Sequence, residues 1–321
     1  MRTHVFAPLG MQQTDYVLSE RVRAQLAQGY QFGRGEFSPV EYQTILTPGA
    51  GSVFSTLNDM ALYMRALLRG GRNEHGTLLE PGTLRLMLQP HYQRDTHLPA
   101  MGLGFILEDI AGHQIVWHNG GWYGFSSEMF LAPDDDLGII LFTNTLSFAL
   151  HDAARGLLRR LLDLPAPAAQ LPRPGLLETA HLWPELTGSY GPASGLSTNL
   201  EVWSSSGGEV EVVVKGNRLA LRSLLGKSRA GDTLYRADPT RPLVFEARHD
   251  QDVQAVVFFR DAAGKIAGLY LGLHTFYKRP RTRSLRFRLA AGLGAFAGAA
   301  AALAARRLWK WGHAQGTRHE R

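Results

Sequence analysis

The 321-residue chain contains no cysteine. That absence excludes disulfides, thiolate catalysis and cysteine-based zinc sites, although it does not identify a compartment. The first eleven residues, Met1–Met11, also lack an apolar run as long as a signal peptide requires. They predict instead the end of a helix, broken at Pro8 and stopped at Gly10. Because a domain rarely begins at the end of a helix, this start is unusual.

The body of the chain lacks an excess of positive charge. From Lys278 to Arg321 there are 11 Lys and Arg residues and one acid, Glu320, so this tail carries +10. The remaining residues hold 34 − 11 = 23 basic and 28 − 1 = 27 acidic side chains, a net −4. A nucleic-acid-binding domain would show basic residues over a folded face. We therefore expect no nucleic-acid partner and a tail that lies near an anionic surface.

The tail also contains an uncharged run of 17 residues, 289–305. As a helix this run would span about 26 Å at ~1.5 Å per residue, close to the ~30 Å hydrocarbon core of a bilayer. Small residues recur at every fourth position, which suits contact between membrane helices: Ala290, Gly294, Gly298 and Ala302. We predict a C-terminal transmembrane helix and a membrane-associated protein of the cell envelope, on the periplasmic or extracellular face. A soluble alanine-rich helix is the alternative.

The first half of the chain predicts an α+β fold. Residues 12–52 contain so many Gly and Pro residues that we expect a long packed loop. A helix follows the cap residue Thr56 and ends at Gly70–Gly71, and a second begins at Pro81. Alternating apolar runs then predict an antiparallel sheet packed by a helix, with strands at 102–108, 113–118, 125–132 and 137–144 and the helix at 148–162.

The second half predicts a separate all-β part. Five prolines between residues 164 and 184 are typical of a stiff linker. Short runs rich in β-formers follow, separated by Gly, Asp or Pro, and they predict a small barrel-like domain. The expected organisation is an α+β domain at 1–163, a linker at 164–184, a barrel at 185–277 and a basic tail at 278–321.

The stretch from Ile115 to Phe125 is the strongest candidate for a site. An apolar strand there runs into His118, and Gly120 and Gly121 follow. A histidine can transfer a proton near neutral pH, and glycine lets another molecule approach the backbone closely. The alternative is a hairpin turn whose histidine caps a strand end. Asp134, Asp135 and Asp136 form a turn in which we expect solvated acids, so no metal is predicted.

Several motifs in order resemble the C-terminal half of the serine β-lactamase-like hydrolases, which include class C β-lactamases, penicillin-binding DD-peptidases, D-aminopeptidases and esterases. The motifs are Pro8-Leu9-Gly10-Met11, Gly29-Tyr30, the run from Pro48 to Ala61, and His118-Asn119-Gly120. The last is similar to the family's third motif, Lys-Thr-Gly or His-x-Gly. The resemblance covers about residues 1–165, and residues 186–277 resemble a β-barrel that some members append.

The resemblance implies acyl transfer through a serine ester, with a small-molecule or peptide acyl substrate and no cofactor. It implies that His118 faces the site and positions substrate or relays a proton. Asn119, Gly120 and Gly121 would bind substrate, and the Gly121 N–H would be an oxyanion-hole donor. Because His118 stands where many members have lysine, ester or peptide cleavage is favoured over β-lactam turnover.

The chain departs from the family at the nucleophile. No lysine has a serine three positions before it, no tyrosine has an asparagine two positions after it, and no Gly-x-Ser-x-Gly motif is present. Our first hypothesis is therefore the C-terminal part of a serine hydrolase, inactive by itself. The second is a non-catalytic, membrane-tethered binding module of the same fold. The third is an interaction protein whose active part is the tail.

Overall fold

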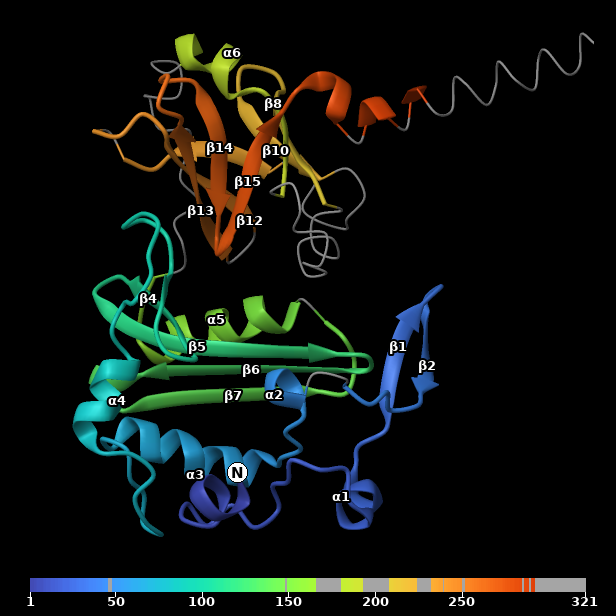
Figure 1. Cartoon of the computed structure of the whole chain (residues 1–321), viewed down its shortest axis with the longest axis vertical. Coiled ribbons are helices and arrows are strands. Elements are labelled where there is room, and N and C mark those ends of the chain that lie inside the picture. The colour runs from blue at the N-terminus through green and yellow to red at the C-terminus, as the bar shows by residue number, and fades with distance from the viewer. Residues whose placement is uncertain are drawn as a thin grey trace, which may run out of the picture. The chain divides into compact units, whose positions relative to one another are not determined.

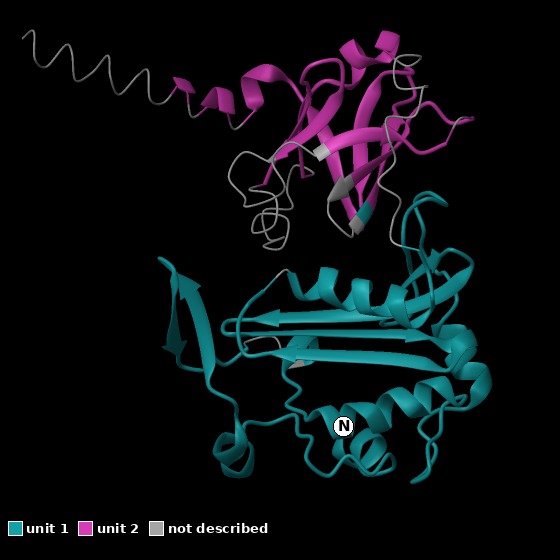
Figure 2. Cartoon of the chain, turned by 180° about the vertical axis from the view of Figure 1, so that it is seen from behind, with its two compact units in different colours: residues 1–170, 250–253 teal, residues 171–249, 254–321 magenta. Residues whose placement is uncertain are grey.

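A computed structural model of the chain describes residues 1–45, 48–147, 149–165, 180–192, 208–223, 232–238, 240–249, 252–284, 286–288 and 290–291. The chain forms two compact units, residues 1–170 with 250–253 and residues 171–249 with 254–321 (Figure 2). Each unit has hydrophobic clusters of its own, which the sequence patterns of the two halves predict.

The first unit is built on an antiparallel sheet of five strands in the order β3-β4-β5-β6-β7 (Figure 1). The strands are β3 (Ala100–Met101), β4 (Ile106–Ile110), β5 (His113–Trp122), β6 (Phe125–Ala132) and β7 (Leu137–Thr143). Turn residues with positive φ join them, as at Ala111 (57°), Gly112 (90°) and Asp136 (49°). The sheet confirms the predicted α+β class. The two residues of β3 were too few for a periodic signal.

Helices cover both faces of this sheet. Helices α3 (Leu57–Leu68) and α4 (Pro81–Met87) pack on the face that contains Val116, Met129 and Leu131. Helix α5 (Ala149–Leu161) packs on the opposite face, against Ile115 and Phe130. Neighbouring residues of a strand thus enter different cores, as the pleat requires.

The helix positions were predicted well, but the spacing of apolar residues predicts a wider buried face than the structure shows on α3 and α5. Leu57 is 50% exposed, although the spacing places it on the buried face of α3. On α5, Leu157 and Leu161 are 39% and 52% exposed, whereas Ala154 and Leu158 are fully buried. A narrower stripe is buried because each helix contacts only one face of a sheet.

The prediction of an irregular loop at residues 12–52 was wrong. The segment contains α1 (Glu20–Gln25), the hairpin of β1 (Gly29–Gly33) and β2 (Glu36–Val40), and α2 (Pro48–Gly51). Arg34 and Gly35 form the hairpin turn with φ of 53° and 88°. The glycines that suggested a loop therefore end two short strands.

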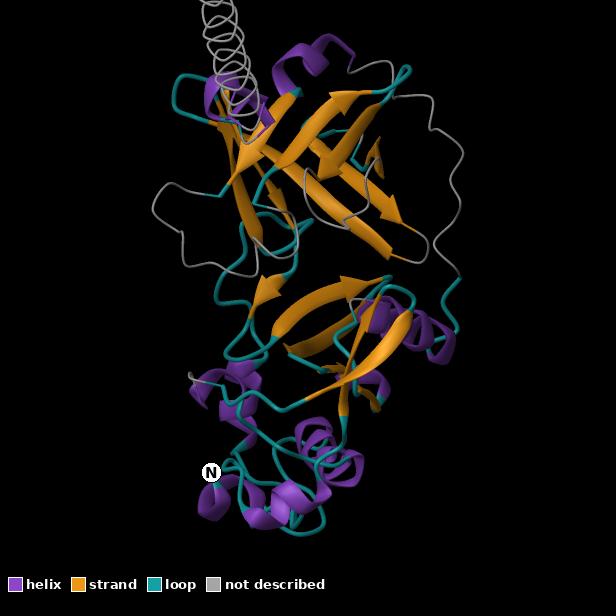
Figure 3. Cartoon of the chain, turned by 90° about the vertical axis from the view of Figure 1, so that its right-hand side faces the viewer, coloured by secondary structure: helices purple, strands orange, loops and turns teal. Residues whose placement is uncertain are grey.

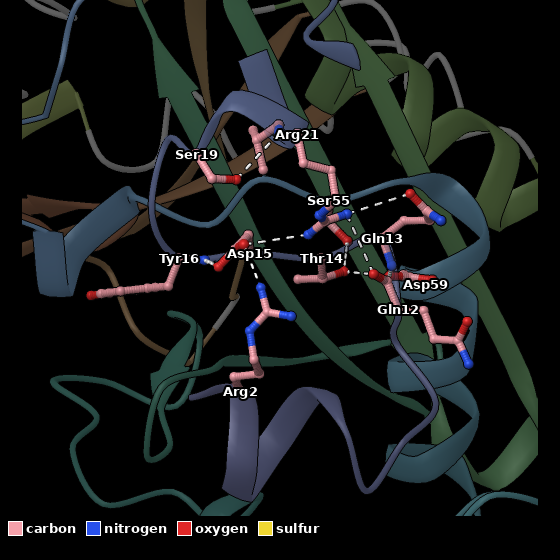
Figure 4. Close-up of polar contacts among 11 residues, drawn as sticks. Arg2, Gln12, Gln13, Thr14, Asp15, Tyr16, Ser19, Arg21, Ser55 and Asp59 are labelled. Atoms are coloured by element: carbon pink, nitrogen blue, oxygen red, sulfur yellow. Dashed lines mark hydrogen bonds and ion pairs between the residues drawn. The ribbon is translucent and has the colours of Figure 1, made fainter. Parts of the chain in front are cut away.

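A buried polar network ties the N-terminal segment to α3 (Figure 4). The Asp59 carboxylate, on a residue that is 5% exposed, accepts hydrogen bonds from the Gln13 N–H at 2.8 Å and the Thr14 hydroxyl at 2.7 Å. The Asp59 N–H donates to the Thr56 hydroxyl, which caps the helix as predicted. Thr14 also hydrogen-bonds Ser55 at 2.8 Å. Asp59 therefore satisfies donors from a segment 45 residues away.

Asp15, beside this network, joins two arginines (Figure 4). Its carboxylate lies 2.5 Å from Arg2 and 3.3 Å from Arg21, and it accepts the Tyr16 N–H at 2.8 Å. Burial alone raises the pKa of Asp15, but the hydrogen bond from Tyr16 and the charges of Arg2 and Arg21 outweigh burial and lower this pKa.

The second unit contains a closed barrel of eight strands, which confirms the predicted barrel. Its order is β10-β11-β12-β13-β14-β15-β8-β9. The strands are β8 (Gly188–Gly191), β9 (Val210–Val214), β10 (Leu219–Ser223), β11 (Asp232–Arg236), β12 (Val244–His249), β13 (Asp252–Arg260), β14 (Ile266–Leu271) and β15 (His274–Arg279). Tyr190, Phe245, Phe258 and Phe276 fill the interior beside α6 (Trp183–Leu186). Residues 200–203, one of the short runs rich in β-formers that predict the barrel, lie outside the described residues.

Two further predictions lie largely outside the described residues. The linker at 164–184 is described only at its two ends, and the apolar helix at 289–305 only at residues 290 and 291. Within the described parts of the chain, no helix has both the length and the apolar character needed to cross a membrane.

We predict that Asp59→Ala lowers the free energy of unfolding by about 1–3 kcal/mol, because two buried donors lose their acceptor. Urea denaturation of the full chain measures this change. The exposed Asp134→Ala is the control and should stay within about 0.5 kcal/mol of the parent. Equal stability of the two variants would contradict the role assigned to Asp59.

We also predict a pH-dependent contribution from Asp15. Its pKa is lower in the folded chain than its ordinary value of 3.8, so its ion pairs stabilise the fold above that pH. The stabilisation is lost as the pH falls through the folded-state pKa. Asp15→Asn should therefore lower the melting temperature at pH 7, and the difference from the parent should shrink below about pH 3.8. A difference that is constant with pH would refute this assignment.

Candidate functional site

Strand β5 carries the predicted site residues, and its two neighbours pair with different lengths of it. β4 pairs with β5 from His113 to Trp117, whereas β6 pairs with it as far as Trp122. Residues 118–122, here called the half-paired stretch, therefore have β6 on one side and no strand of the described chain on the other. The predicted strand ended at His118, which was wrong, because β5 continues through both glycines.

Two tight turns determine which backbone groups face the open edge. Ile110 and His113 close the β4–β5 turn, and Trp122 and Phe125 close the β5–β6 turn. A two-residue hairpin closes on a hydrogen-bonded pair, and the backbone N–H and C=O groups of successive residues then point toward opposite neighbouring strands. Counting from either turn shows that the backbone groups of odd-numbered β5 residues point toward the β4 side. The N–H groups of Asn119 and Gly121 consequently point out of the open edge.

The side chains of the half-paired stretch alternate between the two faces of the sheet. Val116 belongs to the core beneath α3, so His118 and Gly120 lie on that same face. Ile115 belongs to the core beneath α5, so Asn119 and Gly121 lie on the other face. His118 and Asn119 are both exposed. The four predicted residues are consecutive on β5, and the N–H groups that face the open edge lie one and three positions after the His118 imidazole.

Ser127 joins this group, although the sequence analysis did not identify it. It pairs with Gly120 across β5 and β6, and a Cβ on Gly120 would lie only 2.7 Å from the Ser127 hydroxyl oxygen. The hydroxyl therefore lies over Gly120, on the face that carries His118. The alternation of side-chain direction along a strand, counted from Met129 in the core beneath α3, would have placed Ser127 on this face.

Two further residues support the site from the α5 side. Glu128 is 5% exposed and pairs across the strands with Asn119. Its carboxylate lies 3.1 Å from Nδ1 of His151 on α5, and the His151 ring packs 4.8 Å from that of Trp117. This polar pair, also missed from the sequence, holds α5 against the strands that carry the site.

The segment after β7 covers the α5 side of Gly121. The Ser126 hydroxyl donates to the Thr145 carbonyl at 3.1 Å and accepts the Ser147 N–H at 2.9 Å. A Cβ on Gly121 would lie 3.2 Å from Leu146, so glycine allows this segment to pack closely. Gly121 is therefore held by β6 on one edge and by this loop on the α5 face, while its N–H points out of the open edge.

The arrangement suits proton transfer and the binding of a carbonyl oxygen. An exposed imidazole can exchange a proton near neutral pH, and a fixed N–H at a strand edge can donate to a developing negative charge. Among the described residues, no group of three His, Asp or Glu side chains is placed to hold a metal ion.

We predict that Gly120→Ala destabilises the chain by about 1–3 kcal/mol, because its Cβ would overlap the Ser127 hydroxyl. Ser127→Ala added to that variant should recover most of the loss, since it removes the overlapping atom. Urea denaturation of both single variants and the double variant measures the coupling. Strictly additive effects would show that the hydroxyl does not lie over Gly120.

Comparison with known proteins identifies the first unit. The beta-lactamase family model matches residues 1–164, just over half of the chain. The unguisins hydrolase ungD' of Aspergillus campestris is 30% identical over 173 residues, which cover 50% of this chain and 31% of that protein. The beta-lactamase-like 1 protein of Homo sapiens is 30% identical over 145 residues, covering 43% of this chain and 27% of the human protein.

A solved structure matches both units. The crystal structure of SurE aligns with a TM-score of 0.51 at 20% identity, covering 87% of this chain and 62% of SurE, which supports the fold alone. The chain spans about a third or less of each curated relative. With the motif order, the antiparallel sheet and the family match in agreement, the chain belongs to the serine beta-lactamase family of hydrolases.

Proposed function

We propose that residues 1–164 form the substrate-side wall of a serine hydrolase that cleaves an ester, amide or D-peptide through an acyl-enzyme. The observation that carries this proposal is the Gly121 N–H at the open edge of β5. A backbone donor held in a fixed strand can stabilise the oxyanion of an acyl-transfer step, an effect of roughly 10²–10³ in rate. A substrate lying along the open edge of residues 118–122 would present its carbonyl to this donor.

His118 would act on the same substrate from the α3 face of the sheet. Its exposed imidazole lies three residues before Gly121 and shares its face with the Ser127 hydroxyl. In this proposal His118 positions the acyl group or relays a proton, and Asn119 and Gly120 contact the substrate. Ser127 adds a hydroxyl to the same wall.

The nucleophile would come from an N-terminal part of the same hydrolase. Neither Ser-x-x-Lys nor Tyr-x-Asn occurs in the 321 residues, whereas the curated relatives extend well beyond the matched region. We therefore propose that this chain is the C-terminal part of the enzyme and inactive by itself.

The alternative is a non-catalytic binding module of the same fold, tethered to a membrane by the basic tail. The net charge of +10 from Lys278 onward favours attraction to an anionic membrane surface. Both readings place the protein in the cell envelope, facing the periplasm or the outside. They differ in whether a nucleophile reaches the open edge of β5.

An assay of p-nitrophenyl acetate hydrolysis tests the proposal. The 321-residue chain should not exceed the uncatalysed rate. A protein extended in frame through the upstream half-domain should turn the ester over, and His118→Ala in that protein should lower kcat/KM by about 100-fold. His113→Ala is the matched control, because His113 begins the same strand and pairs with Asp135 instead.

Turnover by the extended protein that survives His118→Ala unchanged would contradict the proposed role of β5. An upstream reading frame without Ser-x-x-Lys would favour the binding module instead. In that case N-acetyl-D-alanine should still bind to the 321-residue chain.

A further inference from the structure

The loop after β7 presents a leucine to solvent beside the proposed donor. Leu146 is 50% exposed, although large apolar side chains usually find a buried position. A Cβ on Gly121 would lie 3.2 Å from Cδ1 of Leu146, so the leucine side chain lies directly over this glycine. Leu146 therefore places an apolar surface against the residue whose N–H points out of the open edge.

The course of the loop brings Leu146 to the open edge of the sheet. The residue before Leu146 and the residue after it both hydrogen-bond the Ser126 hydroxyl of β6. Leu146 itself reaches one strand further, to Gly121 of β5. On the far side of that strand, residues 118–122 have no strand of the described chain. Leu146 thus covers the last strand at this end of the sheet, on the α5 face, which also carries the exposed Asn119 side chain.

The loop is also held from the β1–β2 hairpin. The Tyr30 N–H donates to the Asn144 carbonyl at 2.8 Å, and the Asn144 side chain donates to the Gln28 carbonyl at 2.9 Å. The hairpin stands in front of the sheet when the first unit is viewed from this end (Figure 3). Since contacts from two directions fix the backbone that carries Leu146, a ligand would pay little ordering entropy to pack against it.

A substrate that extends along the open edge would contact this leucine. An extended acyl compound whose carbonyl accepts the Gly121 N–H would lie beside β5 as an added strand, and its side groups would alternate between the two faces of the sheet. Of the two side groups that flank the bound carbonyl, one therefore points to the α5 face, where Leu146 and Asn119 lie. The other points to the α3 face, where it meets His118.

We propose that Leu146 is a specificity-determining residue that binds an apolar side group of the acyl substrate on the α5 face of the open edge. The inference rests on the proposed function, and it names the substrate class as extended acyl compounds with a branched aliphatic group next to the bound carbonyl. Complete burial of a leucine side chain is worth roughly 10- to 150-fold in affinity, so contact between two half-buried aliphatic groups accounts for about 10-fold.

Two probes that differ only in this side group test the proposal on the 321-residue chain. N-acetyl-D-leucine amide should bind about 10-fold more tightly than N-acetyl-D-alanine amide, and both should shift the NMR amide signal of Gly121 during titration. Leu146→Ser should lower the affinity for the leucine probe to that for the alanine probe. Leu146→Met keeps an apolar side chain of similar volume and should retain the preference. Leu86→Ser is the matched control, because Leu86 is 49% exposed on α4.

The outcomes separate the inference from the proposed function. If both probes shift the Gly121 signal with equal affinity, or if the preference survives Leu146→Ser, the inference is overturned while the proposed donor stands. If neither probe shifts that signal, the proposed function and the inference fail together. Loss of the preference in Leu86→Ser as well would show a general effect on the fold and would also overturn the inference.

Discussion

The pairing of β5 with β6 is the interaction on which the rest of the first unit depends. Two-residue turns at both ends of β5 set its register, and the register sets which backbone groups face outward. Because β4 ends opposite Trp117, the outward groups of Asn119 and Gly121 have no strand of the described chain beside them. A shift of the β5 register by one residue would turn the N–H groups of His118 and Gly120 outward in place of those of Asn119 and Gly121. It would also move every side chain of β5 to the opposite face of the sheet.

The surroundings of this strand pair keep it in place. Gly120 accommodates the Ser127 hydroxyl, and Gly121 accommodates Leu146. Beneath α5, Glu128 and His151 form a polar contact where apolar packing would be the norm. At the end of the sheet the Tyr123 hydroxyl donates to the Gln31 side chain, which joins the β1–β2 hairpin to the β5–β6 turn.

Much of the fold could be predicted from local patterns, and the site only in part. The cap at Thr56 and the four long strands follow from spacing and turn residues, because those signals are local. The sequence also pointed to His118, Asn119, Gly120 and Gly121 as site residues, and the structure places all four on β5. It did not predict the extension of β5 past His118, since glycine weakens any strand signal. Ser127, Glu128 and His151 join the site only through cross-strand and helix contacts, which no local pattern contains.

Amide hydrogen exchange along β5, followed by NMR on the full chain, tests the central claim most directly. The account predicts an alternating pattern, with slow exchange at His118, Gly120 and Trp122, whose N–H groups face β6. Asn119 and Gly121 should exchange at least about 100-fold faster, because their N–H groups face the open edge. Strong protection at Gly121, or the opposite alternation, would show that no free donor is present and would contradict the account.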